Sequence, residues 1–223
     1  MKISEALNSF NTKSPDNWGI SSVRHLDMGC GTFARNPFKA EEVFGADLLD
    51  HPARNIHPSN YFKVDQSLSI PVPDGFFNSI SAYDFIEHLN RSDGYPNTFI
   101  KFMNEASRIL EVGGVLLGVT PAFPSPVSFQ DPTHVNIITE ATVNYFLNRH
   151  VEANNLEYGF TCRFELVAQF WAGPFSAIRK PDWNSDGLKP ALIWNAVKSP
   201  SSLRRHLAGI RSPSHLVWVL RKV

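Results

Sequence analysis

The sequence predicts an α/β protein with a doubly wound, mostly parallel sheet, and three observations support this fold class. Short apolar runs that suit strands alternate along the chain with segments of helical spacing. The first run, 23–28, breaks directly into the glycine turn Gly29-Cys30-Gly31. The run 115–120 is almost continuously apolar, as expected of a central parallel strand covered on both faces. A chain of 223 residues can bury one large core, and we expect a single domain over 1–223.

In the first half of the chain, short strands are separated by turns and connections. Residues 1–19 are expected to form a leader that caps the site. The segment 33–42 predicts only a weak helix after the glycine turn, because Pro37 interrupts it. Such a helix would point its positive end and its free N–H groups at a ligand. The strands expected in this half are 23–28, 43–47, 61–64 and 78–83.

The second half contains the clearest helix. Apolar residues recur on one face of 96–110, and Gly113-Gly114 ends the pattern before the buried strand 115–120. A second helix is expected to start near Thr139 and to run to about residue 150 or 153. The last two strands are expected at 163–171 and 215–222. The segment 174–214 between them is too long for a hairpin turn and is interpreted as an insert that forms a lid or a homodimer contact.

Composition narrows the function classes. The formal net charge is zero, and no platform of interleaved aromatic and basic residues predicts nucleic-acid binding. No apolar stretch is long enough to cross a membrane, and the polar N-terminus lacks the apolar core of a signal peptide, so we expect a cytoplasmic protein. The two cysteines are too few for a disulfide framework, and Cys30 is interpreted as a small residue packed in the glycine turn.

The residues around the glycine turn indicate a nucleotide-like ligand. Gly29 and Gly31 let the backbone approach a ligand closely. Asp27, two residues before the turn, repels a pyrophosphate and attracts an ammonium group. Asp47 ends the second strand, where an acid can bind both hydroxyls of a ribose. Asp65 follows the third strand and could either accept from an adenine amino group or cap the next turn.

Two other functions remain open. Because Gly29-x-Gly31-x-x-Ala34 also satisfies a dinucleotide fingerprint, an NAD-dependent oxidoreductase is one alternative. Asp27 and the absence of an evident Tyr-x-x-x-Lys pair weigh against it. A cofactor-binding protein without catalysis is the other.

Four stretches occur in a characteristic order and spacing: Leu26-Asp27-Met28-Gly29-Cys30-Gly31-Thr32, Gly45-Ala46-Asp47, Ser81-Ala82-Tyr83-Asp84-Phe85-Ile86-Glu87-His88-Leu89 and Arg108-Ile109-Leu110-Glu111-Val112-Gly113-Gly114-Val115-Leu116. On these stretches, the chain resembles class I S-adenosylmethionine-dependent methyltransferases of the UbiE-like, small-molecule type, over roughly residues 23–136. The resemblance implies a Rossmann-like sheet of seven strands whose last strand is antiparallel, and S-adenosylmethionine as the cofactor. Phe33 replaces a frequent third glycine of the family, and Asn78 replaces a frequent aspartate.

The resemblance also implies contacts for each part of the cofactor. Asp27 and the two glycines would hold the methionine moiety, Asp47 the ribose hydroxyls, and Asp65 and Gln66 would lie by the adenine, while Tyr83 would supply contacts under the sulfonium. The residues so implied to bind the cofactor are Asp27, Gly29, Gly31, Asp47, Leu48, Asp65, Gln66 and Tyr83.

Methyl transfer is an in-line displacement that depends mainly on positioning, and a base is needed only where the acceptor must lose a proton. His134 and His88 are the candidate bases, and Asp131 with His134 is the candidate acceptor-binding pair. For His134 a structural role, bracing its loop, weighs equally. For His88 the structural role is favoured, because Glu87-His88 recurs across the family in enzymes with different chemistries. The loop 131–136 also looks like one in bacterial methyltransferases encoded with glycan enzymes. We therefore expect O-methylation of a small molecule, a saccharide or a lipid-linked sugar.

Asp84, Glu87, His88 and His134 resemble the metal-binding set of small-RNA 3′-end methyltransferases, which would place a divalent ion beside the acceptor hydroxyl. In this chain an aspartate replaces the first glutamate of that set. On the sequence alone, we expect no metal site.

Overall fold

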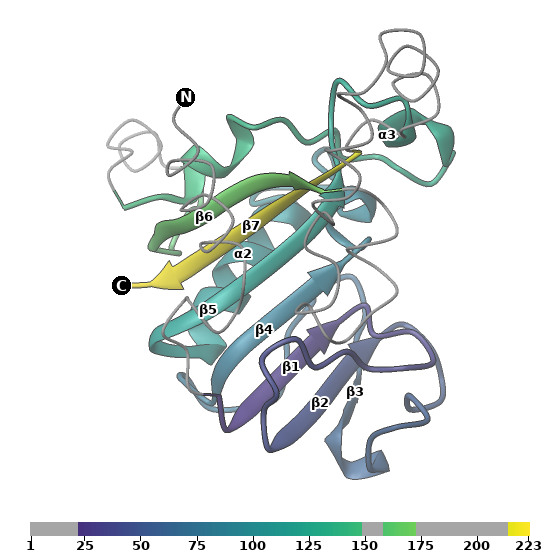
Figure 1. Cartoon of the computed structure of the whole chain (residues 1–223), viewed down its shortest axis with the longest axis vertical. Helices are drawn as coiled ribbons and strands as arrows, with labels where there is room; N and C mark the ends of the chain where they lie inside the picture. Colours follow the sequence, from purple (N-terminus) through teal and green to yellow (C-terminus); the bar gives the residue numbers. More distant parts are fainter. Residues whose placement is uncertain (1–21, 149–157, 173–213) are drawn as a thin grey trace, which may run out of the picture.

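Seven strands form one mixed sheet in the computed structural model, which describes residues 22–148, 158–172 and 214–223 (Figure 1). The strand order is β3-β2-β1-β4-β5-β7-β6. The first five strands are parallel, and β7 runs antiparallel to both of its neighbours, so the predicted fold class is confirmed. The strands are β1 (Arg24–Met28), β2 (Glu42–Asp47), β3 (Tyr61–Lys63), β4 (Phe77–Tyr83), β5 (Leu110–Pro121), β6 (Phe164–Ala172) and β7 (His215–Lys222).

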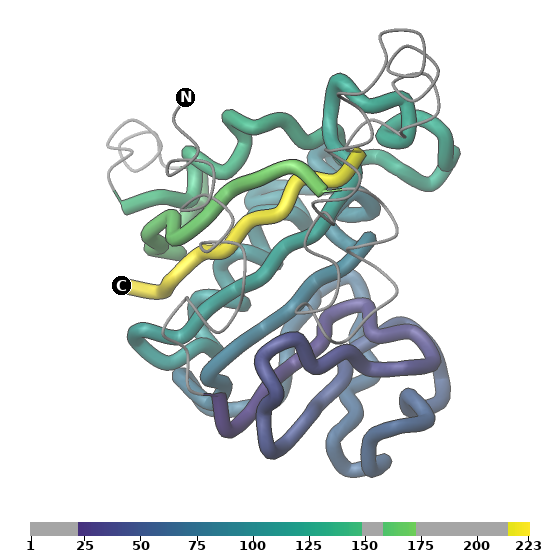
Figure 2. The backbone as a smooth tube through the Cα atoms, viewed as in Figure 1, coloured from purple at the N-terminus to yellow at the C-terminus, as the bar shows by residue number. Residues whose placement is uncertain are grey.

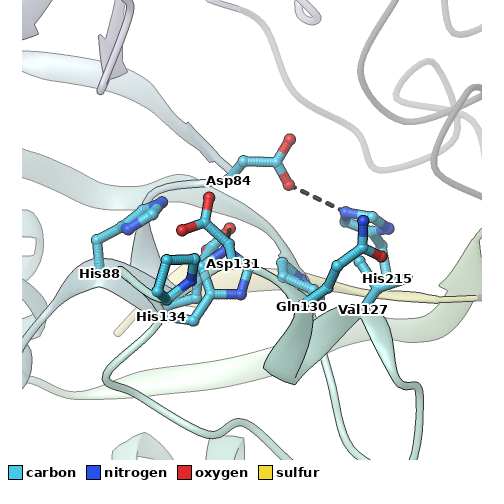
Figure 3. Close-up of a pocket in the computed structure, with 10 residues that line it drawn as sticks. Asp84, His88, Val127, Gln130, Asp131, His134 and His215 are labelled. Carbon is cyan, nitrogen blue, oxygen red and sulfur yellow. Dashed lines mark hydrogen bonds and ion pairs between the residues drawn. The ribbon is translucent and has the colours of Figure 1, made fainter.

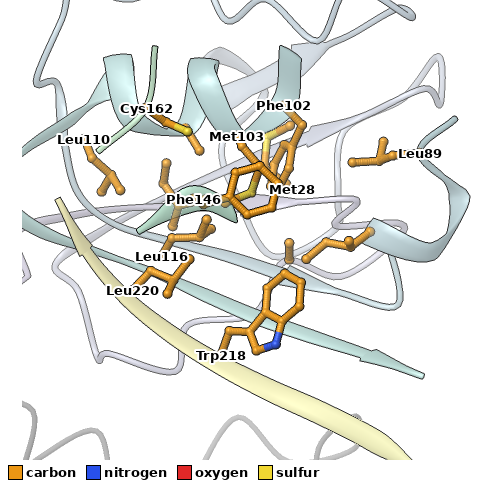
Figure 4. Close-up of a cluster of buried hydrophobic side chains, with 14 of the residues drawn as sticks. Met28, Leu89, Phe102, Met103, Leu110, Leu116, Phe146, Cys162, Trp218 and Leu220 are labelled. Atoms are coloured by element: carbon orange, nitrogen blue, oxygen red, sulfur yellow. The ribbon is translucent and has the colours of Figure 1, made fainter. Parts of the chain in front are cut away.

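The long helix α2 (Thr98–Ile109) forms as predicted and covers one face of the sheet. Its first turn is capped by the side chain of Asn97, which accepts from the backbone N–H of Ile100. Phe102 and Met103 lie on its apolar face and are almost fully buried in the main core, which also contains Met28 of β1 and Trp218 of β7 (Figure 4). This core fixes the position of the strand ends that carry the site.

The opposite face of the sheet carries a different mixture of side chains. Valines of β5 and β7 form a second apolar cluster there with Phe38 and Tyr83. Towards β1 that face becomes polar, because the register of β1 and β4 pairs His25 with Ser79 and Asp27 with Ser81. All four of these side chains are buried. A buried polar strip therefore leads to the glycine turn.

The helix predicted weakly over 33–42 is absent, and this prediction is wrong. Pro37 removes a backbone donor, and side chains satisfy the neighbouring backbone groups instead. Asn36 bonds both the N–H and the carbonyl of Ala40, and Asn55 does the same for Ala34. No helix end therefore faces a ligand directly after the glycine turn, and the turn must work through its own backbone.

The second helix predicted from Thr139 is also different in the structure. A short 3-10 helix, η4 (Thr142–Phe146), takes its place. Leu147 then becomes extended and forms a parallel bridge with Phe164, while the N–H of Asn148 donates to the Phe164 carbonyl. Pairing with β6 thus ends the helix before residue 149.

Directly after β5 the chain loops out beyond the carboxyl edge of the sheet, and it then continues past β6 to the start of that strand (Figure 2). It includes the short helix α3 (Val127–Gln130), beyond the end of β5, and the loop 131–138. Two other 3-10 turns are η2 (Pro58–Asn60) and η3 (Ile86–His88). The expected leader 1–19 and almost all of the insert 174–214 lie outside the described residues. Within the described ranges, no helix is long and apolar enough to cross a membrane.

Candidate active site

The glycine turn links the ends of β1 and β2 by hydrogen bonds. The N–H of Gly29 donates to the carbonyl of Ala46 at 2.8 Å, and the N–H of Gly31 donates to Oδ2 of Asp47 at 2.8 Å. Both glycines have positive φ, +69° at Gly29 and +56° at Gly31, which other residues adopt at a cost. Among the described residues, no atom would lie within 4 Å of a Cβ on Gly31. The turn therefore presents open backbone beside the carboxylate of Asp47.

Tight packing holds the turn from behind. A Cβ on Gly29 would lie 2.7 Å from Cδ2 of Phe85, and one on Gly45 would lie 2.7 Å from Sγ of Cys30. Cys30 is buried without a disulfide, as expected of a small packed residue. Phe85 follows β4, so the glycine turn touches the segment that lines the neighbouring pocket.

Asp27 lies beneath the turn and is fully buried. Its Oδ2 accepts from the backbone N–H of Arg35 at 2.8 Å and lies 3.7 Å from the Arg35 guanidinium, and its Oδ1 accepts from the Ser81 hydroxyl at 2.7 Å. Burial nevertheless raises the pKa of Asp27 to about 6, against the opposing influence of Arg35. Both oxygens of the carboxylate thus accept hydrogen bonds from protein groups, and one of these bonds holds the segment after the turn in place.

A directional chain of hydrogen bonds ends at Asp27. Because the Ser81 hydroxyl donates to the carboxylate, its oxygen must accept from Nε2–H of His25, 2.9 Å away. Burial lowers the pKa of His25 to about 3, so its ring is neutral and its Nδ1 accepts from Ser79 at 2.8 Å. The charge of Asp27 therefore fixes the tautomer of a histidine two residues away.

The remaining predicted cofactor residues lie at the same edge of the sheet, in the strand order β3, β2, β1, β4. Leu48 and Gln66 are exposed. Asp65 caps its own turn by accepting from the N–H of Ser67 at 2.7 Å, which leaves it exposed beside β3. The Tyr83 ring is only 4% exposed, and the Arg35 guanidinium lies over it, 4.8 Å from the ring centroid. Arg35 therefore covers the ring that was expected to lie under the cofactor.

A pocket of about 520 Å³ opens beside the glycine turn, at the ends of β4 and β5 and the start of β7 (Figure 3). On one side Asp84, with φ of +46°, accepts from Nε2 of His215 at 3.0 Å, and Nδ1 of His215 bonds the Ser214 hydroxyl at 2.9 Å. None of the described residues that line the pocket is a lysine or an arginine. The lining residues are Asp84, Glu87, His88, Pro121, Val127, Gln130, Asp131, Pro132, His134 and His215.

On the other side of the pocket the structure brings both predicted histidines together. The His88 and His134 rings lie 5.0 Å apart, and Nε2 of His134 lies 3.9 Å from Oε1 of Glu87. Asp131 accepts from the hydroxyl of Thr133 at 2.7 Å and lines the same pocket. Glu87 is 1% exposed, and burial raises its pKa to about 8. One atom each from Glu87, His88 and His134 lies within 4.8 Å of the others, close enough to hold a metal ion.

The loop that carries His134 is fixed to η3. The backbone N–H groups of Val135 and Asn136 both donate to the carbonyl of Glu87 at 2.9 Å. The Asn136 side chain donates to the carbonyl of Ile86 at 2.9 Å. The position of His134 relative to Glu87 is therefore set by backbone contacts.

Three site residues were not identified from the sequence. His25 could have been found from strand alternation, since it lies on the same face of β1 as Asp27. Arg35 lies in the irregular segment after the turn, and His215 is far from Asp84 along the chain, so no sequence pattern pairs either one with its partner.

No protein-family description matches this sequence, and no curated protein matches it. Solved structures do. An S-adenosylmethionine-dependent methyltransferase from Archaeoglobus fulgidus is similar with a TM-score of 0.54 at 16% identity, over 99% of this chain and 93% of that chain. A second S-adenosylmethionine-dependent methyltransferase, from Mesorhizobium loti, is similar with a TM-score of 0.51 at 14% identity, over 91% of this chain and 92% of that chain.

A third similar structure is geranyl diphosphate C-methyltransferase from Streptomyces coelicolor, solved with Mg²⁺, geranyl diphosphate and S-adenosyl-L-homocysteine. Its TM-score is 0.50 at 14% identity, over 98% of this chain and 77% of that chain. These similarities agree with the strand order and with the glycine turn between β1 and β2. The chain has the fold of class I S-adenosylmethionine-dependent methyltransferases.

Proposed function

We propose that this protein is an S-adenosylmethionine-dependent methyltransferase that acts on an oxygen of a small, polar acceptor. The observation that carries the proposal is the hydrogen bond between the Gly31 N–H and Asp47. This bond holds Asp47, the acid that we propose to bind the ribose, beside open backbone at the carboxyl edge of the sheet, where ligands of such folds bind.

The residues of the turn fit this cofactor. Gly31 leaves room for close approach, and Asp47 offers carboxylate oxygens to the ribose hydroxyls. Asp65 and Gln66 are exposed after β3 and are proposed to contact the adenine. Asp27 and Asp47 are both acids at the turn and disfavour the pyrophosphate of NAD. When bound, S-adenosylmethionine supplies an electrophilic methyl group.

The pocket beside the turn supports a polar acceptor. Its lining combines carboxylates, histidines and an amide, which suits a molecule rich in hydroxyl groups such as a saccharide. Nδ1 of His134 donates to the carbonyl of Ser128 at 3.2 Å, so Nε2 is free to accept a proton. His134 is thus proposed as the base that deprotonates the acceptor hydroxyl while the pocket holds it in line with the methyl group.

Calorimetric titration with S-adenosylmethionine, S-adenosylhomocysteine and NAD tests the proposal. We expect both adenosyl ligands to bind and NAD not to bind. Asp47→Asn should weaken their affinity by about tenfold or more, the cost of one lost charged hydrogen bond. Asp50→Asn is the matched control, because the Asp50 side chain is 86% exposed and pairs with Lys63. Binding of NAD alone would favour an oxidoreductase, and adenosyl binding without turnover on any acceptor would favour a non-catalytic protein.

A further inference from the structure

The structure assigns a binding site for one divalent transition-metal ion to Glu87, His88 and His134. This site differs from the four-residue set considered from the sequence, because Asp84 is turned to His215 on the other side of the pocket (Figure 3). Two imidazoles and one carboxylate remain, contributed by η3 and by the loop after β5.

An unpartnered oxygen points to a missing ligand. Glu87 is 1% exposed, and its Oε1 has no hydrogen-bond partner among the described residues, whereas its Oε2 accepts from the Thr120 hydroxyl at 2.9 Å. A buried carboxylate oxygen without a partner is costly. It lies 3.9 Å from Nε2 of His134. A cation between these two atoms would satisfy both.

Both histidines are held in the tautomer that a metal requires. Nδ1 of His134 donates to the carbonyl of Ser128 at 3.2 Å, and Nδ1 of His88 donates to the carbonyl of Thr133 at 3.2 Å. The Thr133 hydroxyl donates to Asp131, so its oxygen can only accept from His88. Each ring thus carries its proton on Nδ1 and leaves the Nε2 lone pair free, as metal-bound histidines do when their other nitrogen bonds a backbone carbonyl.

The surroundings favour a cation of a particular class. Asp84 and Asp131 add carboxylates to the pocket, and its lining within the described chain includes no lysine or arginine. Two imidazole ligands suit Zn²⁺, Fe²⁺ or Ni²⁺ better than Mg²⁺, Ca²⁺ or Mn²⁺, which prefer oxygen. Donor atoms around such an ion lie about 3.4 Å apart. The ligand atoms now lie within 4.8 Å of one another, so side-chain movements of less than about 2 Å would bring them to the spacing that the ion requires.

Three protein ligands leave coordination positions open, and the pocket lies beside them. An acceptor oxygen bound there would lose its proton more readily, because the ion stabilises the charged form. With the ion bound, Nε2 of His134 is a ligand, so the acceptor proton passes to solvent in the pocket, and the assignment of His134 as the base applies to the metal-free protein. This role rests on the proposed function, whereas the metal site itself does not.

Metal binding by the full chain tests the inference without any acceptor. The protein is stripped with a chelator and titrated with Zn²⁺ by calorimetry, and Co²⁺ absorption reports the ligand field. We expect one ion per chain. Glu87→Gln and, as a second variant at an exposed position, His88→Asn should each weaken Zn²⁺ binding on the order of 100-fold. His51→Ala removes an exposed histidine outside the site and should bind as the wild type does.

The outcomes separate the two proposals. No stoichiometric binding, or unchanged binding in both His88→Asn and Glu87→Gln, would overturn the metal site. Weakened binding in His51→Ala instead would place the ion elsewhere and also overturn it. The same wild-type preparation is titrated with S-adenosylmethionine, so that failure to bind the cofactor counts against the proposed function alone.

Discussion

Replacing Gly31 with alanine should separate the stability of the glycine turn from its role in binding. The residue has φ of +56°, and a Cβ there would meet no atom of the part of the chain that the structure describes within 4 Å. The methyl group would therefore fill space on the ligand side of the turn. The variant is expected to fold and to lose affinity for S-adenosylmethionine.

The two effects can be sized separately. Holding alanine at positive φ lowers the free energy of unfolding by roughly 1–2 kcal/mol. The lower entropy of the unfolded alanine variant raises it by about 0.4–1 kcal/mol. The net destabilisation is about 1 kcal/mol, which lowers Tm by roughly 2–4 °C in a chain of this length. Overlap with a bound ligand costs about 1–3 kcal/mol, or roughly 5- to 150-fold in Kd.

Gly113→Ala is the matched control. Gly113 has φ of +85° and open space around the added Cβ, but it lies in β5 near the opposite end of that strand from the site. Thermal unfolding should show a similar small loss in both variants. Calorimetry should show weakened cofactor binding only in Gly31→Ala, and equal affinity in the two variants would refute the assignment of the turn to the cofactor.

Three further predictions concern the groups beneath the site. Burial raises the pKa of Asp27 to about 6, so the stability that its protonation contributes is complete below about pH 4 and is lost as pH rises through 6. In denaturant titrations from pH 7 to pH 4, the free energy of unfolding of the wild type should therefore rise by up to about 3 kcal/mol more than that of Asp27→Asn. The same pH dependence in both proteins would contradict this. Nitrogen NMR should show His25 protonated on Nε2 in the wild type and on Nδ1 in Asp27→Asn, since the amide would donate to Ser81; one tautomer in both would disprove the chain of hydrogen bonds. Phe102→Ala should cost about 3–5 kcal/mol in unfolding free energy, and a loss below about 1 kcal/mol would show that the core is not packed around this ring.

Most of the sheet could be predicted from the sequence because its strands are marked by local patterns. The continuous apolar run of β5 and the glycines after β1 define a parallel sheet without knowledge of distant contacts. The two helix predictions, at 33–42 and from Thr139, were wrong because other hydrogen bonds replace the helical ones. At 33–42, Asn36 and Asn55 replace helical hydrogen bonds, and after Thr142 the bridge of Leu147 to β6 outweighs helix propensity.

In the candidate site, too, the residues marked by local patterns could be predicted, and those paired through distant strands could not. Gly29, Gly31 and Asp47 could be placed from spacing alone, because neighbouring strands bring their ends together. The pair of Asp84 and His215 could not, since it depends on β7 lying next to β5 at one register. A contact made only by strand order leaves no local trace in the sequence.

The two halves of the site are held by different means, which bears on how the acceptor is selected. The proposed cofactor side relies on backbone N–H groups and on one acid, so it depends on few side chains, and structures with 14–16% identity share the fold that carries it. The proposed acceptor side relies on side chains of η3 and of the loop after β5. That loop is fixed by bonds to the Glu87 backbone, so substitutions at His88 or His134 can alter the chemistry of the pocket without moving its frame. Acceptor specificity should therefore respond to these side chains, while cofactor binding responds to the turn.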